Sequence, residues 1–375
     1  MQSRPNTSLI SYFSNMVKQS GGINLAQGLP GFRPPLKLMQ NLSEISLTDS
    51  HKYAPGLGLD LLRCQIAESC NSTAIGAENV MITNGGTEAI SLIYTWLYKK
   101  LHHQLNVMSF APVYESYREL PGIFGNHFYA FRNDPNQSIN IPLLCEELAR
   151  NEINLVFLAT PGNPLGRIFS EYELTEICNY CSRKRIYLVI DLVYKYLYYD
   201  KKPSIPYSAL SEYILFADSF SKQFSITGWR LGYLIAPPEI ICEIASVHDY
   251  TGLSSPLPLQ KALSMYLSNT SDALQYLQDT REKVSENFEY ASHRLSEAGF
   301  RCIPAHGGIF LCTALPDHFD DGFQFASNLY KSCKVAVVPG EHFDREWKRI
   351  IRLNIAHPAD VLNQALDEII HFSAS

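Results

Sequence analysis

The sequence predicts an α/β protein with two domains: a large domain built on a mostly parallel seven-stranded sheet covered by helices, and a smaller α+β domain. Short, continuously apolar runs alternate with longer amphipathic stretches through the middle of the chain, which is typical of parallel strands buried on both faces. The length of 375 residues exceeds what one ordinary core holds. Polar side chains also follow directly after the apolar runs, where ligands bind in sheets of this kind.

Seven apolar runs supply the strands of the large sheet. Between them, apolar residues recur at helical spacing over 88–101 and 171–183, which predicts helices there. The expected strands are 79–83, 107–110, 127–131, 155–159, 186–190, 214–217 and 232–236.

The pattern changes after about residue 247, where alternating strands and helices indicate the smaller domain. Residues 1–47 show no sheet pattern, and we expect them to pack on that domain. The large domain is therefore expected at 48–247 and the small one at 248–375. The expected elements of the small domain are a helix at 285–298, strands at 308–313, 335–338 and 350–355, and a closing helix at 359–372.

Composition and charge narrow the class of function. The net charge of −6 argues against nucleic acid as the main partner, because phosphate backbones call for a basic surface. No apolar run approaches the roughly 20 residues that a membrane-spanning helix needs, and the N-terminus lacks a signal-peptide pattern. Nine scattered cysteines indicate reduced thiols in the cytoplasm. Cys178 and Cys181 have no second pair at metal spacing, so we expect no metal site.

The segment around Lys222 carries the strongest chemical signal. Lys222 follows a strand end and is flanked by Ser219, and Arg230 comes eight positions later, between Gly228 and Gly232. A lysine whose pKa is lowered by its surroundings forms Schiff bases with aldehydes. A hydroxyl and a guanidinium are suited to binding a phosphate group. The alternative interpretation is an exposed loop lysine near a structural arginine.

Two further segments also follow predicted strands. Gly86 and Thr87 open a helix, where backbone N–H groups attract anions, although a Gly-Gly turn alone is a weak signal. Asp191 needs a cationic or donor partner at a buried strand end, and a protonated ring nitrogen is one. Tyr194 can donate its phenol to a ring oxygen. Lys195 is a rival, both as the partner of Asp191 and as the Schiff-base lysine, but no phosphate-binding pattern surrounds it.

Three more residues are candidates for ligand contacts. Asn163 lies in a Pro/Gly turn and can present its amide to a ligand. Tyr114 can stack on a flat ring. Arg352 lies inside an apolar strand, where a charge seldom lacks a partner, and it can bind a carboxylate bidentately. The alternatives are a turn asparagine, a core tyrosine and a buried ion pair.

In this order and combination, the segments resemble the class I/II aminotransferases of the fold-type I PLP-dependent enzymes, over roughly residues 23–357. The run Gln27-Gly28-Leu29-Pro30 most resembles the members that take glutamine, methionine, aromatic amino acids or kynurenine. The resemblance implies pyridoxal 5′-phosphate (PLP) as cofactor, bound as a Schiff base by Lys222, with Asp191 on its ring nitrogen. It further implies phosphate contacts from Gly86, Thr87, Ser219 and Arg230, ring contacts from Tyr114, Asn163 and Tyr194, and substrate contacts from Gly28, Asn163 and Arg352. It also implies a homodimer in which Tyr53 reaches the partner's phosphate site.

The activity implied by the resemblance is transfer of the α-amino group of a free amino acid to a 2-oxo acid. No second cationic residue stands out as a partner for a side-chain carboxylate, which favours neutral, sulfur-containing or aromatic substrates. A PLP-dependent lyase or cyclase uses the same residues and remains an alternative, as does a non-catalytic ligand sensor. Leu192 stands where the family often has glutamate. Ile309 stands where an aromatic residue is usual, and we expect it near the substrate side-chain pocket.

Overall fold

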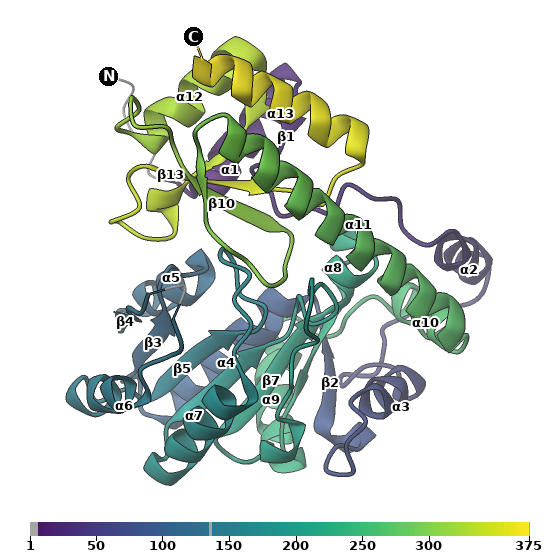
Figure 1. Ribbon diagram of the computed structural model, residues 1–375. Coiled ribbons are helices and arrows are strands. Elements are labelled where there is room, and N and C mark those ends of the chain that lie inside the picture. Colours follow the sequence, from purple (N-terminus) through teal and green to yellow (C-terminus); the bar gives the residue numbers. More distant parts are fainter. Residues whose placement is uncertain (1–6, 135–136, 375) are drawn as a thin grey trace.

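The computed structural model describes residues 7–134 and 137–374, and its larger part is an α/β sandwich (Figure 1). The seven-stranded, mostly parallel sheet predicted from the sequence is confirmed. Its strands are β2 (Val80–Thr83), β3 (Asn106–Phe110), β4 (His127–Phe131), β5 (Leu155–Ala159), β6 (Tyr187–Asp191), β7 (Ile214–Ser219) and β8 (Gly232–Ile235).

The strand order in this sheet is β2-β8-β7-β6-β5-β3-β4. Strand β8 is antiparallel to both of its neighbours, whereas β7, β6, β5, β3 and β4 are mutually parallel. The carboxyl ends of these parallel strands meet at one edge of the sheet, so Asp191 at the end of β6 and Ser219 at the end of β7 lie near each other. The topology therefore gathers the predicted chemical residues on that edge.

The sheet is buried on both faces because successive side chains of a strand point in opposite directions. In β5, Val156 and Leu158 belong to one apolar core, and Leu155 and Phe157 belong to another. Helices that contribute to the first core include α3 (Asp60–Ser69), α6 (Ile141–Arg150) and α7 (Glu171–Lys184). Those that contribute to the second are α4 (Gly86–Lys100), α5 (Glu115–Ile123) and α9 (Pro238–Thr251).

A smaller α+β part covers one end of the sandwich (Figure 1). Its four-stranded antiparallel sheet has the order β12-β13-β10-β9, and its helices enclose a third apolar core. The elements are β9 (Arg301–Cys302), β10 (Phe310–Ala314), β11 (Val335–Ala336), β12 (Val338–Pro339), β13 (Ile350–Asn354), α11 (Thr270–Glu297), α12 (Gly322–Cys333) and α13 (Ala359–Ala374).

Three expectations about this part need correction. The helix expected at 285–298 is the second half of α11, because helical packing continues back through Ala273 and Leu277. The strand expected at 335–338 is two short strands in different sheets, β11 and β12. The N-terminal segment, expected to lack sheet structure, forms β1 (Ile23–Asn24), which pairs with β11 in parallel; two residues are too few to show a periodic pattern.

The two N-terminal helices pack against different parts of the molecule. Helix α1 (Leu9–Ser20) packs into the core of the smaller part through Leu9 and Phe13. Helix α2 (Leu36–Ser46) packs against α10 (Leu257–Leu267), which also contacts α3. The predicted domain limits at residues 47 and 247 stay a prediction, and residues 1–6 of the predicted N-terminal segment lie outside the described residues. Among the helices of the described ranges, none combines the length and apolar character needed to cross a membrane.

Candidate active site

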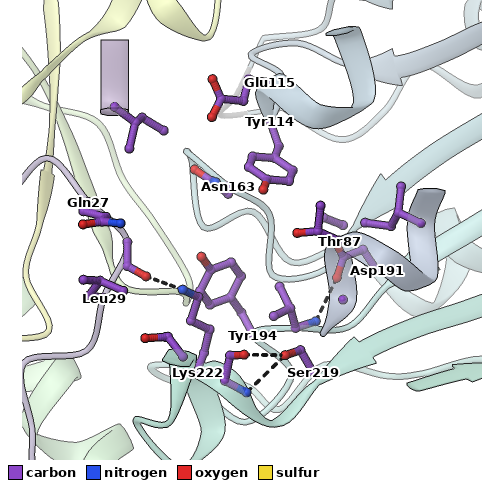
Figure 2. Close-up of a pocket in the computed structure, with 18 of the residues that line it drawn as sticks. Gln27, Leu29, Thr87, Tyr114, Glu115, Asn163, Asp191, Tyr194, Ser219 and Lys222 are labelled. Atoms are coloured by element: carbon purple, nitrogen blue, oxygen red, sulfur yellow. Dashed lines mark hydrogen bonds between the residues drawn. The ribbon is translucent and has the colours of Figure 1, made fainter. Parts of the chain in front are cut away.

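A cavity of about 400 Å³ lies at the carboxyl ends of the central strands, closed on its other side by the smaller part of the molecule. Figure 2 shows side chains of the larger part, such as Asp191 and Lys222, around it, with Gln27 of the N-terminal segment on another side. One predicted site residue, Tyr53, does not line it; its side chain is 81% exposed. The predicted residues that line it are Gly28, Gly86, Thr87, Tyr114, Asn163, Asp191, Tyr194, Ser219, Lys222, Arg230 and Arg352.

Lys222 projects into the cavity from the short helix α8 (Phe220–Gln223), which begins after Ser219. Burial, and then the positive charges of Arg230 and Arg352, lower the pKa of Lys222 to about 8. Its Nζ donates a hydrogen bond to the carbonyl oxygen of Gly28 (Figure 2). About a tenth of this amine is therefore neutral at pH 7 and available as a nucleophile.

Asp191 is a buried carboxyl group without a counter-ion on this chain, among the residues that the structure describes. It accepts hydrogen bonds from the Tyr117 hydroxyl at 2.5 Å and from the Val193 N–H at 3.0 Å. Burial raises the pKa of Asp191 to about 6, although the Tyr117 hydrogen bond opposes the shift. A cationic ligand group would supply the missing charge, and a protonated ring nitrogen has that property.

A positively polarised cradle lies at another side of the cavity. Helix α4 begins at Gly86, and Arg230 Nη2 lies 3.3 Å from the carbonyl oxygen of Asn84, to which it donates. Gly85 has a φ of +88°, and a Cβ there would lie 2.7 Å from Arg230 Nη2. A Cβ at Gly232 would lie 2.6 Å from the backbone of Gly85. Only glycine allows these close approaches, and the helix N-terminus with a guanidinium beside it suits a phosphate group.

Two aromatic hydroxyls face the same space. Burial raises the pKa of Tyr194 and that of Tyr114, so both phenols are neutral donors at physiological pH. The ring of Tyr114 packs edge-on against Tyr117, with centroids 5.3 Å apart, and Tyr117 stacks on Phe157. These contacts fix the orientation of the Tyr114 ring beside the cavity.

Arg352 on β13 is 1% exposed, and its partners are neutral. It donates to Asn163 Oδ1 at 2.9 Å and to the Ala26 carbonyl oxygen at 2.6 Å. Its guanidinium carbon lies 3.8 Å from the ring centroid of Phe310 and 4.6 Å from that of Phe343. Within the described part of the chain its Nε has no hydrogen-bond partner. Burial lowers the pKa of Arg352 to about 10, and an anionic ligand would satisfy both its charge and this N–H.

Lys195, the rival lysine, is buried and does not line the cavity. Its Nζ lies 2.9 Å from Asp218 Oδ2. The alternative of a surface pair between Lys195 and Asp191 is therefore wrong, because both residues are buried and Lys195 pairs with Asp218.

Several lining residues escaped the sequence analysis. Tyr117 follows Tyr114 by one helical turn, and that spacing was the available signal. Glu115 also lines the cavity, and its Oε2 lies 2.8 Å from His342 Nε2. The expectation for Ile309 needs correction: it is fully buried in the core of the smaller part, and its neighbour Phe310 faces the cavity instead.

Comparison with known proteins gives a consistent result. The chain matches the sequence model of the family described as Aminotransferase class I and II over residues 20–369. It is 25% identical to a probable N-succinyldiaminopimelate aminotransferase of Mycobacterium tuberculosis, over 96% of this chain and 94% of the relative. It is 26% identical to the methionine aminotransferase of Escherichia coli, over 97% and 95%. Its fold is similar to that of an aspartate aminotransferase from Thermus thermophilus, with a TM-score of 0.89, 22% identity, and 99% and 97% of the two chains covered.

Proposed function

We propose the following residue roles from one premise: this chain belongs to the aminotransferase class I and II family and is a PLP-dependent aminotransferase. The observation that carries these roles is the convergence of Lys222, Asp191 and Arg230 from three segments on one cavity. An amine, an unpaired carboxyl group and an anion-binding group are the three functions that PLP requires of a protein.

The chemistry of the cavity residues fits the cofactor. PLP carries an aldehyde, a ring nitrogen and a phosphate group. The amine of Lys222 suits the aldehyde because its pKa is lowered, and the carboxyl of Asp191 suits the ring nitrogen because it lacks a counter-ion. The set proposed for the phosphate is Gly86, Thr87, Ser219 and Arg230.

When bound, PLP supplies a ring that accepts the negative charge developing at the substrate Cα. Lys222 Nζ would hold the aldehyde carbon of the cofactor until the substrate amino group displaces it. The released amine would then be free to move a proton from the substrate Cα to that cofactor carbon. The Asp191 carboxylate would keep the ring nitrogen protonated. Tyr194 and the Asn163 amide would hold the ring oxygen, and Tyr114 would hold the ring.

Arg352 binds the substrate α-carboxylate, with Gly28 and Asn163 beside it. Three cationic side chains of the described residues line the cavity, Lys222, Arg230 and Arg352, and each already has a role in this proposal. None remains for a second carboxylate of the substrate. We therefore infer an amino donor with a neutral, sulfur-containing or aromatic side chain, and the methionine aminotransferase among the relatives is consistent with this class.

The test separates transamination from elimination or cyclisation. Purified protein loaded with PLP is given methionine or phenylalanine without a 2-oxo acid acceptor. We expect one equivalent of 2-oxo acid per active site, followed by arrest, and sustained turnover once an acceptor 2-oxo acid is added. Continued product formation with release of ammonia in the absence of acceptor would identify a lyase instead. Preference for aspartate over both donors would contradict the proposed substrate class.

The exposed Tyr53 supports a homodimer in which it reaches the phosphate site of the partner. Tyr250 is 92% exposed, and a Cβ at Gly56 would lie 3.4 Å from Asp249, so these two segments share a surface that carries two exposed aromatic rings. Sedimentation should show that the protein is a dimer. Tyr53→Phe should weaken the binding of PLP, and sedimentation of this variant should still show a dimer. The nine free thiols favour a reducing compartment, and we place the protein in the cytoplasm.

A further inference from the structure

A second lysine and a second aspartate lie directly behind the cavity. Lys195 Nζ lies 2.9 Å from Asp218 Oδ2 and donates to the Tyr233 hydroxyl at 2.9 Å. It also donates to the Tyr207 hydroxyl at 3.4 Å. The Tyr233 hydroxyl donates to Asp218 Oδ2 at 2.6 Å. All four side chains are buried. We call Lys195, Asp218, Tyr207, Tyr233 and Gln223 the rear network.

The other carboxylate oxygen of Asp218 accepts hydrogen bonds from residues at both ends of α8. Asp218 Oδ1 accepts from the backbone N–H of Ser219 at 2.6 Å and from Gln223 Nε2 at 3.2 Å. Ser219 then caps α8, because its hydroxyl accepts from the Ser221 N–H at 3.1 Å. The carboxylate therefore fixes the peptide that presents Ser219 to the cavity.

The rear network alternates along the chain with the residues proposed to bind the cofactor. Lys195 follows Tyr194, and Asp218 precedes Ser219. Gln223 follows Lys222 in the same way. Within each of these three pairs, one side chain lines the cavity and the other belongs to the network.

A fourth residue of the rear network, Tyr233, also follows a residue near the proposed phosphate site. Tyr233 follows Gly232, whose backbone packs against Gly85 and Gly86 at the N-terminus of α4. A shift of Tyr233 would move the strand on which this close contact depends. The rear network thus reaches both elements of the proposed phosphate site, the Ser219 turn and the glycine turn.

A buried ion pair is weak evidence for stability, because desolvation of the two charges offsets much of their attraction. Burial is the largest single influence and acts to lower the pKa of Lys195, but Asp218 and the neighbouring tyrosines together outweigh it and raise that pKa well above its usual value. Lys195 is thus kept charged beside Asp218 in a dry position, at a cost that a well-packed apolar pair would avoid. Such a pair is best explained by the positions in which it holds the surrounding backbone.

We propose that the ion pair between Lys195 and Asp218 is a positioning device that sets the Ser219 turn and the glycine turn for the phosphate group of the cofactor. This inference rests on the proposed function of the cavity. The phosphate site has few contacts that can adjust, since glycine backbone and a helix N-terminus form much of it. A shift of either turn therefore weakens phosphate binding more than binding of the ring.

The experiment compares PLP with pyridoxal, which lacks the phosphate. Two double variants of the full-length chain replace the ion pair without leaving a lone buried charge: Lys195→Met/Asp218→Leu, and Lys195→Met/Asp218→Asn, which keeps an acceptor for the Ser219 N–H. Each protein is stripped of cofactor and titrated by absorbance with either compound. We expect the Leu variant to bind PLP at least tenfold more weakly and the Asn variant about threefold more weakly. The affinity of both for pyridoxal should stay within about twofold of the unmodified protein.

The matched control is Glu173→Gln. Glu173 is a buried carboxylate that pairs with Arg167 and accepts backbone N–H groups, but it lies outside the cavity and the rear network. It should lower thermal stability without changing the ratio of PLP to pyridoxal affinity. Equal losses for the two compounds, or none, would overturn the positioning role. If the Leu variant does not fold, the selective threefold loss in the Asn variant decides. An unmodified protein that fails to bind PLP would refute the proposed function itself.

Discussion

The molecule has two neighbouring sets of one lysine and one aspartate, and they differ in whether the two side chains form an ion pair. Lys222 and Asp191 face the cavity, and the structure contains no ion pair between them or with another described residue. Lys195 and Asp218 lie behind the same strand ends, joined at 2.9 Å and surrounded by hydroxyl groups. The same two residue types therefore serve as reactive groups on one side and as a fixed support on the other.

The difference shows how this fold separates function from support. On the cavity side, burial lowers the pKa of Lys222 to about 8 and raises that of Asp191 to about 6. Both shifts favour the neutral forms, as expected for groups that wait for a partner. On the rear side, the pKa of Lys195 is raised because its partner is already present. Unsatisfied groups face the ligand, and satisfied groups hold the backbone.

The largest effect should separate the two lysines. Lys222→Ala removes the nucleophile, and we expect kcat/KM for transamination to fall by on the order of 10⁴-fold or more. Its complex with PLP should lack the Schiff-base absorbance, and borohydride should not fix the cofactor at position 222. Lys195→Met is the paired control: at saturating PLP it should retain the absorbance and the borohydride adduct. An adduct at Lys195 would reverse the assignment of the two lysines.

Asp191→Asn should lower kcat/KM by about 10³-fold, because a neutral amide cannot keep the ring nitrogen protonated. In the cofactor-free protein, the same substitution should be favourable, because it should increase stability at pH 8. The pKa of Asp191 is raised from 3.8 to about 6 in the folded state, so the folded state binds a proton more tightly. The stability of the cofactor-free protein therefore falls as pH rises from about 4 through about 6, by up to about 3 kcal/mol.

The measurement is thermal unfolding of the two cofactor-free proteins at a series of pH values. Asp191→Asn should be more stable than the unmodified protein at pH 8, and the difference should vanish near pH 4. Equal stability at pH 8 would show that Asp191 carries no such cost. Asp218→Asn is the comparison: it leaves Lys195 as a lone buried charge and should destabilise at pH 8.

Arg352→Met should raise KM for α-amino acids by about 10²-fold, the value of a charge-assisted hydrogen-bonded pair. The flexible methionine can still pack between Phe310 and Phe343, whose rings flank the guanidinium. Primary amines without a carboxylate should react at nearly the same rate with either protein. An equal rise in KM for amines and amino acids would mean that Arg352 only shapes the cavity.

Local pattern predicted most of the fold, and long-range contacts account for the rest. The strands at 127–131 and 155–159 have the predicted bounds, since continuous apolar runs leave little ambiguity. Strand β7 extends past its predicted end at 217 and takes in the buried Asp218. Its partner Lys195 lies 23 residues earlier in the sequence, and no local pattern shows that such a pair is buried.

The residues of the candidate site also differ in whether local sequence pattern or long-range packing identifies them. Residues that directly follow apolar strands, such as Asp191 and Ser219, were identifiable from their position. The hydroxyl of Tyr117 beside Asp191 and the two rings around Arg352 depend on tertiary packing between separate elements. Composition signalled that such aromatic residues were present, but it could not say which of them reach the cavity.

The smallest effect concerns the pH dependence of Lys222. With a pKa of about 8, its neutral fraction rises about tenfold between pH 7 and pH 9 and then levels off, whereas an ordinary lysine would gain about a hundredfold and keep rising. The rate at which cofactor-free protein forms the Schiff base, followed by stopped-flow absorbance, should show that plateau. Arg230→Gln removes the larger of the two charge contributions that lower the pKa of Lys222, so it should move the plateau to higher pH. The double variant Lys195→Met/Asp218→Asn, which removes an ion pair with no net charge and leaves the cavity charges in place, should not move it.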